Sequence, residues 1–145
     1  MSEKGKASRP LFTVVMNVYN GEQWLEEALK SVFAQTFDDW ELLFWDDQST
    51  DGSAKVLEKF PEDPRVRYVY ALEQTPLSKA RELAIKEARG EWLAFLDQDD
   101  VWTPDKLEKQ AKVIKEWDGA ELDIVYGRAL RFGVPGTPRD FDQWH

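Results

Sequence analysis

The feature that most constrains the fold of this chain is a series of short apolar segments separated by segments of helical periodicity. The short segments are rich in β-branched and aromatic residues, as strands are, and cover residues 11–16, 40–45, 66–70, 92–96 and 124–126. Three of them are almost entirely apolar, so both faces of these strands must be buried. This pattern favours the α/β class, with a mostly parallel sheet and helices on both of its faces.

The intervening segments have amphipathic helical patterns and carry helix start signals. The residues expected at or near the helix starts are Asn20, in a capping box with Gln23, then Ser49 or Asp51, Thr75-Pro76 and Thr103-Pro104. Right-handed crossovers bring the carboxyl ends of parallel strands to one edge of the sheet, where open α/β sheets bind ligands. Residues that directly follow the strands are therefore the candidates for function.

The charge balance and composition exclude several classes of protein. The 145 residues include 28 acidic and 19 basic side chains, which gives a formal net charge of −9. Binding to a phosphate backbone depends on clustered Lys and Arg, so we expect no nucleic-acid partner. No apolar run approaches the roughly 20 residues of a transmembrane helix. The absence of cysteine excludes disulfides, thiolate zinc sites and cysteine nucleophiles.

The first candidate cluster covers residues 46–52 after the second predicted strand, with the sequence Asp-Asp-Gln-Ser-Thr-Asp-Gly. Such residues cap helix starts by accepting hydrogen bonds from backbone amides, but one or two of them suffice for that. The adjacent Asp46 and Asp47 repel each other unless a donor or a cation lies between them. The cluster is thus either a capped turn or part of a binding site.

The second candidate cluster follows the fourth predicted strand and contains Asp97, Asp99 and Asp100. Three carboxylates within four positions raise one another's pKa and are unfavourable without a partner. Mg²⁺ or Mn²⁺ is commonly held by one or two carboxylates together with substrate phosphates and water. We therefore favour a divalent-cation site over a solvated acidic turn.

The third candidate element is Asn17 with Tyr19, at the end of the first predicted strand. Tyr19 can stack on a planar base while Asn17 hydrogen-bonds it, although a half-buried aromatic residue beside a helix cap would have the same pattern. Because all three clusters end parallel strands, we expect them to meet at one edge of the sheet. The glycine-rich phosphate loops, the zinc-protease motif and the serine nucleophile elbow are absent.

These motifs resemble the inverting glycosyltransferases of family two, which have the Rossmann-like GT-A fold and transfer sugars from nucleotide diphosphates. The matching stretches are residues 14–20, 35–42, 46–52, 80–81 and 90–105. The resemblance implies a nucleotide-diphosphate sugar as donor, with a UDP-sugar expected, and Mn²⁺ or Mg²⁺ as cofactor. It leaves the acceptor unidentified.

By this resemblance, Tyr19 would stack on a uracil-like base with Asn17 beside it. Asp47 would accept a hydrogen bond from the imide N–H of the base. Asp97 and Asp99 would form the D-x-D pair, with Asp99 in direct contact with the cation that bridges the diphosphate. Asp97 would also contribute to nucleotide binding.

Three further positions are expected near the nucleotide by the same resemblance. Arg81 would assist nucleotide binding. Gln48 stands where the family favours glycine, and Glu82 replaces the asparagine that usually follows the arginine. Both departures are expected to alter contacts to the base or the ribose.

The resemblance also implies a division of the chain into a flexible segment 1–10, a nucleotide-sugar-binding α/β domain 11–130, and residues 131–145 as a loop that starts an acceptor-binding part. The catalytic base is expected beyond residue 145, so no catalytic residue is nominated. We expect the chain to supply the donor-binding half of a transferase and to be incomplete for transfer by itself. A cytoplasmic location is expected, at the cytoplasmic face of a membrane where parts outside these residues attach to it.

Two other functions remain open at this stage. Residues 96–101 fit the haloacid-dehalogenase phosphatase signature, with Asp97 as nucleophile and Asp99 as acid and base. That motif normally ends the first strand, whereas here it follows the fourth predicted strand. The second alternative is a non-catalytic nucleotide-binding module.

Overall fold

The computed structural model describes residues 8–131 and 139–140. Its elements in chain order are β1 (Phe12–Val18), α1 (Glu22–Phe33), β2 (Trp40–Asp46), α2 (Ser53–Glu58), β3 (Val66–Tyr70), α3 (Leu77–Glu87), β4 (Trp92–Phe95), α4 (Lys106–Glu116), β5 (Leu130–Arg131) and β6 (Arg139–Asp140). The chain divides into two compact units, Met1–Glu108 and Lys109–His145. The boundaries expected at residues 11 and 130 stay predictions, and most of the two terminal segments lies outside the described residues.

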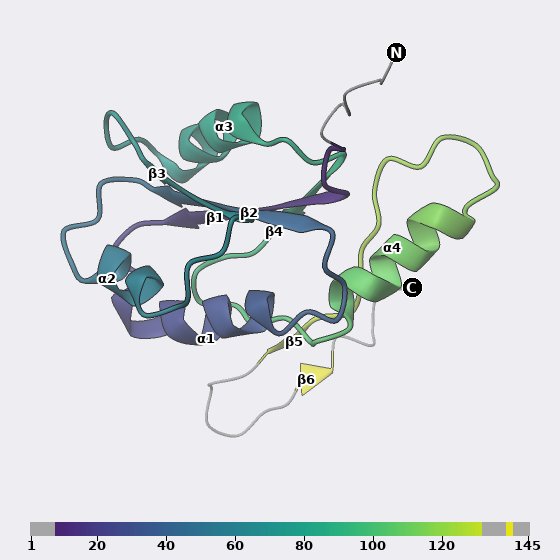
Figure 1. The fold of residues 1–145 in the computed structure, drawn as a ribbon, viewed down its shortest axis with the longest axis horizontal. Helices are drawn as coiled ribbons and strands as arrows, with labels where there is room; N and C mark the ends of the chain where they lie inside the picture. The colour runs from purple at the N-terminus through teal and green to yellow at the C-terminus, as the bar shows by residue number, and fades with distance from the viewer. Residues whose placement is uncertain (1–7, 132–138, 141–145) are drawn as a thin grey trace, which may run out of the picture. The chain divides into compact units, whose positions relative to one another are not determined.

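The first unit is a four-stranded sheet with the strand order β3-β2-β1-β4. Every neighbouring pair in this sheet is parallel. Helix α3 covers one face of the sheet, and α1 and α2 cover the other (Figure 1). The predicted α/β class with helices on both faces is therefore confirmed.

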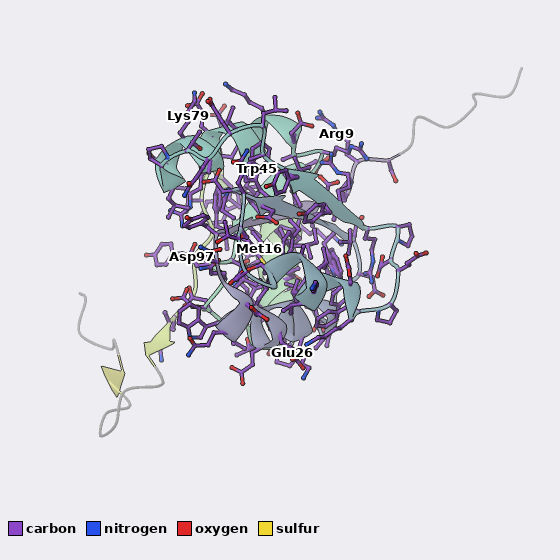
Figure 2. The ribbon with its side chains drawn as sticks, turned by 90° about the vertical axis from the view of Figure 1, so that its left-hand side faces the viewer. Arg9, Met16, Glu26, Trp45, Lys79 and Asp97 are labelled. Atoms are coloured by element: carbon purple, nitrogen blue, oxygen red, sulfur yellow. The ribbon has the colours of Figure 1, made fainter. Side chains whose placement is uncertain are left out.

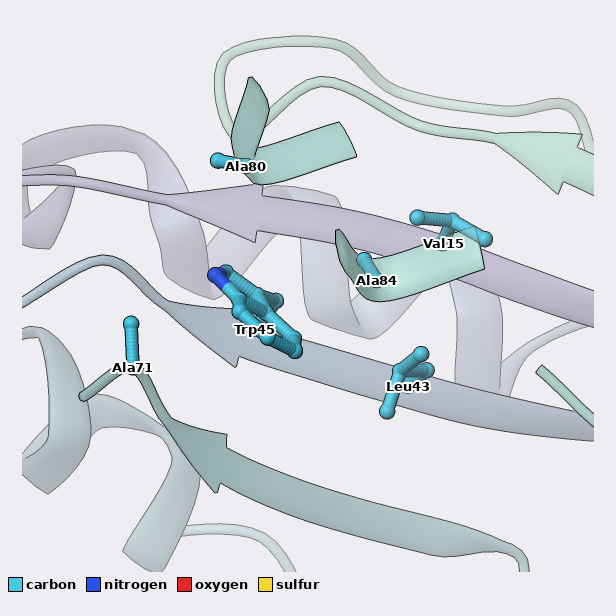
Figure 3. Close-up of a cluster of buried hydrophobic side chains, with 6 residues drawn as sticks. All are labelled: Val15, Leu43, Trp45, Ala71, Ala80 and Ala84. Atoms are coloured by element: carbon cyan, nitrogen blue, oxygen red, sulfur yellow. The ribbon is translucent and has the colours of Figure 1, made fainter. Parts of the chain in front are cut away.

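The two central strands explain why the apolar pattern predicts this class. Every residue of β2 is buried, and β1 is buried at six of its seven positions. On the α3 face a cluster joins Trp45 with small alanines of α3 and with neighbouring strand residues (Figure 3). Its members are Val15, Leu43, Trp45, Ala71, Ala80 and Ala84. The alanines let α3 lie close to the sheet and position the first turns of this helix near the strand ends.

The predicted capping box of α1 is wrong, whereas Asp51 serves the start of α2 as predicted, since its Oδ1 accepts a hydrogen bond from Ser53 N–H (2.9 Å). The N-cap residues are Gly21 and Gly52, without a side-chain cap of their own. In addition, polar side chains bond across the two loops: Asp51 Oδ2 accepts a hydrogen bond from Glu22 N–H (3.1 Å), and Glu22 Oε2 accepts one from Gly52 N–H (2.9 Å). Asn20 has a left-handed backbone (φ 48°). Asp51 thus satisfies backbone N–H groups at the start of its own helix and at the start of α1.

In the second unit, the predicted fifth strand at residues 124–126 is wrong, since these residues have no regular secondary structure. Ile124 and Tyr126 are 76% and 89% exposed, so this short apolar run has no buried face. The Val125 carbonyl accepts a hydrogen bond from Gln110 Nε2 (3.1 Å) rather than from a strand. The unit instead contains the short antiparallel pair β5–β6. Within the described part of the chain, no helix combines the length and apolarity needed to cross a bilayer.

Candidate functional site

A cavity of about 350 Å³ lies at the carboxyl ends of β1, β2 and β4. Its walls include all the residues that the sequence predicts to contact the nucleotide base or the cation, namely Asn17, Tyr19, Asp47, Asp97 and Asp99. Asp97 and Arg9 lie at opposite ends of the sheet, with Trp45 between them (Figure 2). The structure therefore brings the three sequence clusters together at one edge.

Two side chains in the cavity wall have buried polar atoms without a partner. Asn17 Nδ2 and Thr75 Oγ1 make no hydrogen bond among the described residues. Buried polar groups are nearly always satisfied, so each exception needs a ligand, a water molecule or a structural reason. Their common position in this wall favours the binding of a polar ligand or of ordered water.

The adjacent carboxylates Asp46 and Asp47 have different surroundings. Asp46 is 1% exposed, and its two oxygens accept hydrogen bonds from Ser49 N–H (2.7 Å) and from the Tyr68 hydroxyl (2.7 Å). Burial, followed by the hydrogen bond and charge of Asp46, raises the pKa of Tyr68. Asp46 therefore holds the turn, as the capped-turn interpretation expects, and it is absent from the cavity wall.

Asp47 is the member of this pair that lines the cavity. It is 5% exposed, and its carboxylate accepts a hydrogen bond from Thr75 N–H (3.1 Å). Its own N–H donates to the Val18 carbonyl (2.8 Å), which fixes the backbone beside β1. A carboxylate has about four lone-pair positions, so Asp47 keeps acceptor capacity for a donor in the cavity.

The acidic turn after β4 has more negative charge than nearby positive charge. Arg81 of α3 pairs with Asp97 (2.5 Å), although Arg81 itself is not part of the cavity wall. Asp99 is exposed and makes no hydrogen bond or ion pair within the described part of the chain. Burial first, and then the charges of Asp99 and Asp97, raise the pKa of Asp100. Among the described residues, Asp99 and Asp100 are thus left without a counter-charge.

A divalent cation would supply that counter-charge. Among residues 8–131 and 139–140, no three His, Asp or Glu side chains converge as a preformed metal site. Mg²⁺ and Mn²⁺ do not require one, because one or two carboxylates with phosphate oxygens and water complete their coordination. The oxygen ligands of Asp97 and Asp99 on the cavity wall fit this kind of cation.

Sequence reasoning did not identify Gln98, Gln74 and Thr75 as cavity residues. The side chain of Gln98 forms two hydrogen bonds with the backbone of Tyr19, a residue that is 43% exposed. Thr75 has the pattern of a helix start, and glutamine carries no chemical signal by itself. Only the folded chain places these side chains at the strand ends.

The two departures from the family pattern have different structural outcomes. Gln48 has a left-handed backbone (φ 66°), which explains why glycine is favoured at this position. Its Nε2 donates to the carbonyls of Ala71 (3.2 Å) and Leu72 (3.0 Å), beside the loop that leads to Thr75. Glu82 is absent from the cavity wall and pairs with Lys79 and Lys86, whose hydrogen bonds and charges lower its pKa to about 2.

Comparison with known proteins gives a consistent family assignment. The sequence model of Glycosyl transferase family 2 matches residues 13–142. The putative teichuronic acid biosynthesis glycosyltransferase TuaG of Bacillus subtilis is 38% identical over 128 residues, which cover 88% of this chain and 51% of TuaG. The chain therefore spans about half of the length of this relative.

Solved structures agree with the sequence match. The S. aureus TarS 1-349 structure in complex with UDP superposes with a TM-score of 0.66 and 31% identity, covering 72% of this chain and 32% of that one. Mannosyltransferase PcManGT from Pyrobaculum calidifontis, in complex with GDP-Man and Mn²⁺, gives a TM-score of 0.65 and 28% identity, covering 73% and 32%.

Proposed function

Because this chain belongs to glycosyl transferase family 2 and has its GT-A fold, we propose that it is the donor-binding part of an enzyme that transfers a sugar from a nucleotide diphosphate to an acceptor. The observation that supports this most strongly is the strand-end cavity. One of its walls has an exposed aromatic side chain with amide and carboxylate groups, and another has the carboxylates of Asp97 and Asp99, of which Asp99 has no counter-charge among the described residues. A base with a diphosphate needs both kinds of wall.

At the base side of the cavity, Tyr19 stacks on the ring and Asn17 donates from its free Nδ2. Asp47 accepts a hydrogen bond from the imide N–H of the base. Uracil has this N–H, and a solved relative was crystallised with UDP. We therefore propose UDP as the preferred nucleotide.

At the diphosphate side, Asp99 and Asp97 would hold Mn²⁺ or Mg²⁺, with Asp99 making the direct contact. Such a cation stabilises the negative charge that develops on the departing diphosphate. Arg81 orients Asp97 through their ion pair and adds positive charge near the phosphates. We further propose that transfer inverts the anomeric centre and that its catalytic base lies outside residues 1–145.

The same geometry argues against the phosphatase alternative. The phosphatase motif normally ends the first strand of a chain, whereas here Asp97 follows β4. β4 is also the edge strand of the sheet beside β1. With the family match, these features favour a nucleotide sugar over a phosphoester as the substrate.

A base-selectivity experiment tests the proposed nucleotide pocket. UDP and CDP are titrated calorimetrically with Mn²⁺ into the wild type, Asp47→Asn and the control Asp100→Asn. Cytosine has an acceptor where uracil has the imide N–H, so Asp47 should disfavour CDP by about ten-fold or more. The amide of Asp47→Asn can donate, so the preference for UDP should shrink, while Asp100→Asn should retain it. A wild-type chain that binds neither nucleotide would refute the proposal.

A further inference from the structure

The side chain of Gln98 takes the place of a strand partner for Tyr19. The pairing of β1 with β4 ends at Val15 and Phe95, followed by the bond from Leu96 N–H to the Val15 carbonyl (3.1 Å). Beyond that point, Gln98 Oε1 accepts from Tyr19 N–H (3.0 Å) and Gln98 Nε2 donates to the Tyr19 carbonyl (3.2 Å). One amide thus satisfies both backbone groups of Tyr19 across 79 positions of sequence.

Gly21 provides an independent sign that this contact is closely fitted. A Cβ atom at Gly21 would lie 2.4 Å from Gln98 Oε1 and 2.6 Å from its Cδ. The Gly21 backbone (φ −103°) is open to any residue, so the absence of a side chain here provides space rather than conformational freedom. The chain therefore leaves room for the Gln98 amide beside Tyr19.

The location of this amide connects the two sides of the cavity. Gln98 lies between Asp97 and Asp99, and all three residues line the cavity together with Tyr19. In the described part of the chain, the other side-chain tie between this acidic turn and a neighbouring element is the Arg81–Asp97 pair. Loss of the Gln98 amide would leave the turn held by one exposed ion pair and its own backbone.

We propose that Gln98 is a positioning residue that fixes the spacing between Tyr19 and the Asp97–Asp99 carboxylates. What it positions rests on the proposed function, since the base would contact one side and the cation-bound diphosphate the other. The two hydrogen bonds between the Gln98 amide and the Tyr19 backbone, which we call the tether, exist in the free protein. The tether can therefore be tested without a ligand.

The first test measures backbone amide hydrogen exchange by NMR in the free protein. Gln98→Met keeps the side-chain length but removes donor and acceptor, and Gln23→Met on the exposed surface of α1 is the matched control. Exchange at the Tyr19 amide should be about five-fold faster in Gln98→Met and unchanged in Gln23→Met. The single substitution Gly21→Ala should also accelerate exchange at the Tyr19 amide. Added to Gln98→Met, it should have no further effect on that exchange. Unchanged exchange at Tyr19 would overturn the tether.

The second test asks whether the tether serves nucleotide binding. UDP affinity with Mn²⁺ should fall about five-fold in Gln98→Met, while Gln23→Met keeps the wild-type affinity. Gln98→Glu is a conservative second variant, because its carboxylate keeps the acceptor for Tyr19 N–H and lacks the donor to the Tyr19 carbonyl. At about pH 7.5 the Tyr19 amide should therefore exchange more slowly in Gln98→Glu than in Gln98→Met.

The outcomes of the two tests separate the tether from the proposed function. Equal UDP affinity in Gln98→Met and the wild type would overturn the positioning role even if Tyr19 exchange changes. A wild-type chain that binds no UDP would overturn the proposed function and the role of Gln98 in binding. The exchange data would still decide whether the tether exists.

Discussion

Replacing Tyr68 by phenylalanine tests the division of roles between the two adjacent aspartates. The change removes one hydroxyl, which donates to Asp46 Oδ2 (2.7 Å). Because Asp46 is 1% exposed, water cannot easily replace this donor. A hydrogen bond to a buried charged group contributes about 2 kcal/mol. For a chain of this size, that loss lowers the melting temperature by roughly 8 °C.

The assay for this prediction is urea unfolding with thermal melting, together with a UDP titration. Tyr70→Phe is the matched control, because Tyr70 is in the same strand, is 56% exposed and has no hydroxyl hydrogen bond within the described residues. Tyr68→Phe should lose about 2 kcal/mol of unfolding free energy with less than a two-fold change in UDP affinity. Asp47→Asn should show the reverse, near-normal stability and about ten-fold weaker UDP binding. A Tyr68→Phe variant as stable as Tyr70→Phe would refute the structural role of Asp46.

Two further predictions concern Glu41 in β2 and Gln48 in the loop after β2. The pKa of the Glu41 carboxyl is lowered in the folded chain. Burial alone would raise this pKa, but hydrogen bonds from Thr13 and from Arg89 N–H, together with the charge of Arg67, have the larger combined effect. Glu41 therefore contributes stability above its unfolded-state pKa, and this is lost as the pH falls through the folded-state value. In acid titrations of unfolding free energy, Glu41→Gln should show a shallower loss below about pH 4.5, and an unchanged slope would contradict this. Gln48→Gly should relieve about 1 kcal/mol of left-handed strain but lose two hydrogen bonds and add unfolded-state entropy. The expected net loss of unfolding free energy in urea is about 1 kcal/mol. A Gln48→Gly variant more stable than the wild type would show that the two hydrogen bonds of Gln48 contribute little.

The fold could be predicted from the sequence because its main signals are local. Residues 66–70 are predicted as a strand and form β3 with the same bounds. Burial on both faces is confirmed for β1 and β2, but it is wrong for the edge strand β4, where Leu93 and Phe95 are exposed. The helices and the parallel sheet follow from the alternation of periods. Residues 124–126 show the limit of this reasoning, since an apolar triplet becomes a strand only when a partner and a buried face are available.

The candidate site could be predicted in part for a related reason. Asp47, Asp97 and Asp99 follow strands, and parallel topology alone brings them to one edge. Gln98 and Thr75 form hydrogen bonds with residues 79 and 28 positions away in the sequence. The sequence around Gln98 or Thr75 does not indicate these partners. The bond between Asp51 and Glu22 N–H has the same origin, because the sequence predicts Asp51 as a cap of the following helix but does not show that it also reaches the start of α1.

The measurement that tests the central claim most directly is a calorimetric titration of UDP with and without Mn²⁺, on the wild type, Asp99→Asn and Asp100→Asn. Asp99 lines the cavity, whereas the adjacent Asp100 does not, so these variants remove the same charge at different places. Mn²⁺ should strengthen UDP binding to the wild type by about ten-fold or more. Asp99→Asn should lose this gain, and Asp100→Asn should keep most of it. UDP binding that is absent in the wild type, or an equal effect of the two substitutions, would contradict a nucleotide-diphosphate site at these strand ends.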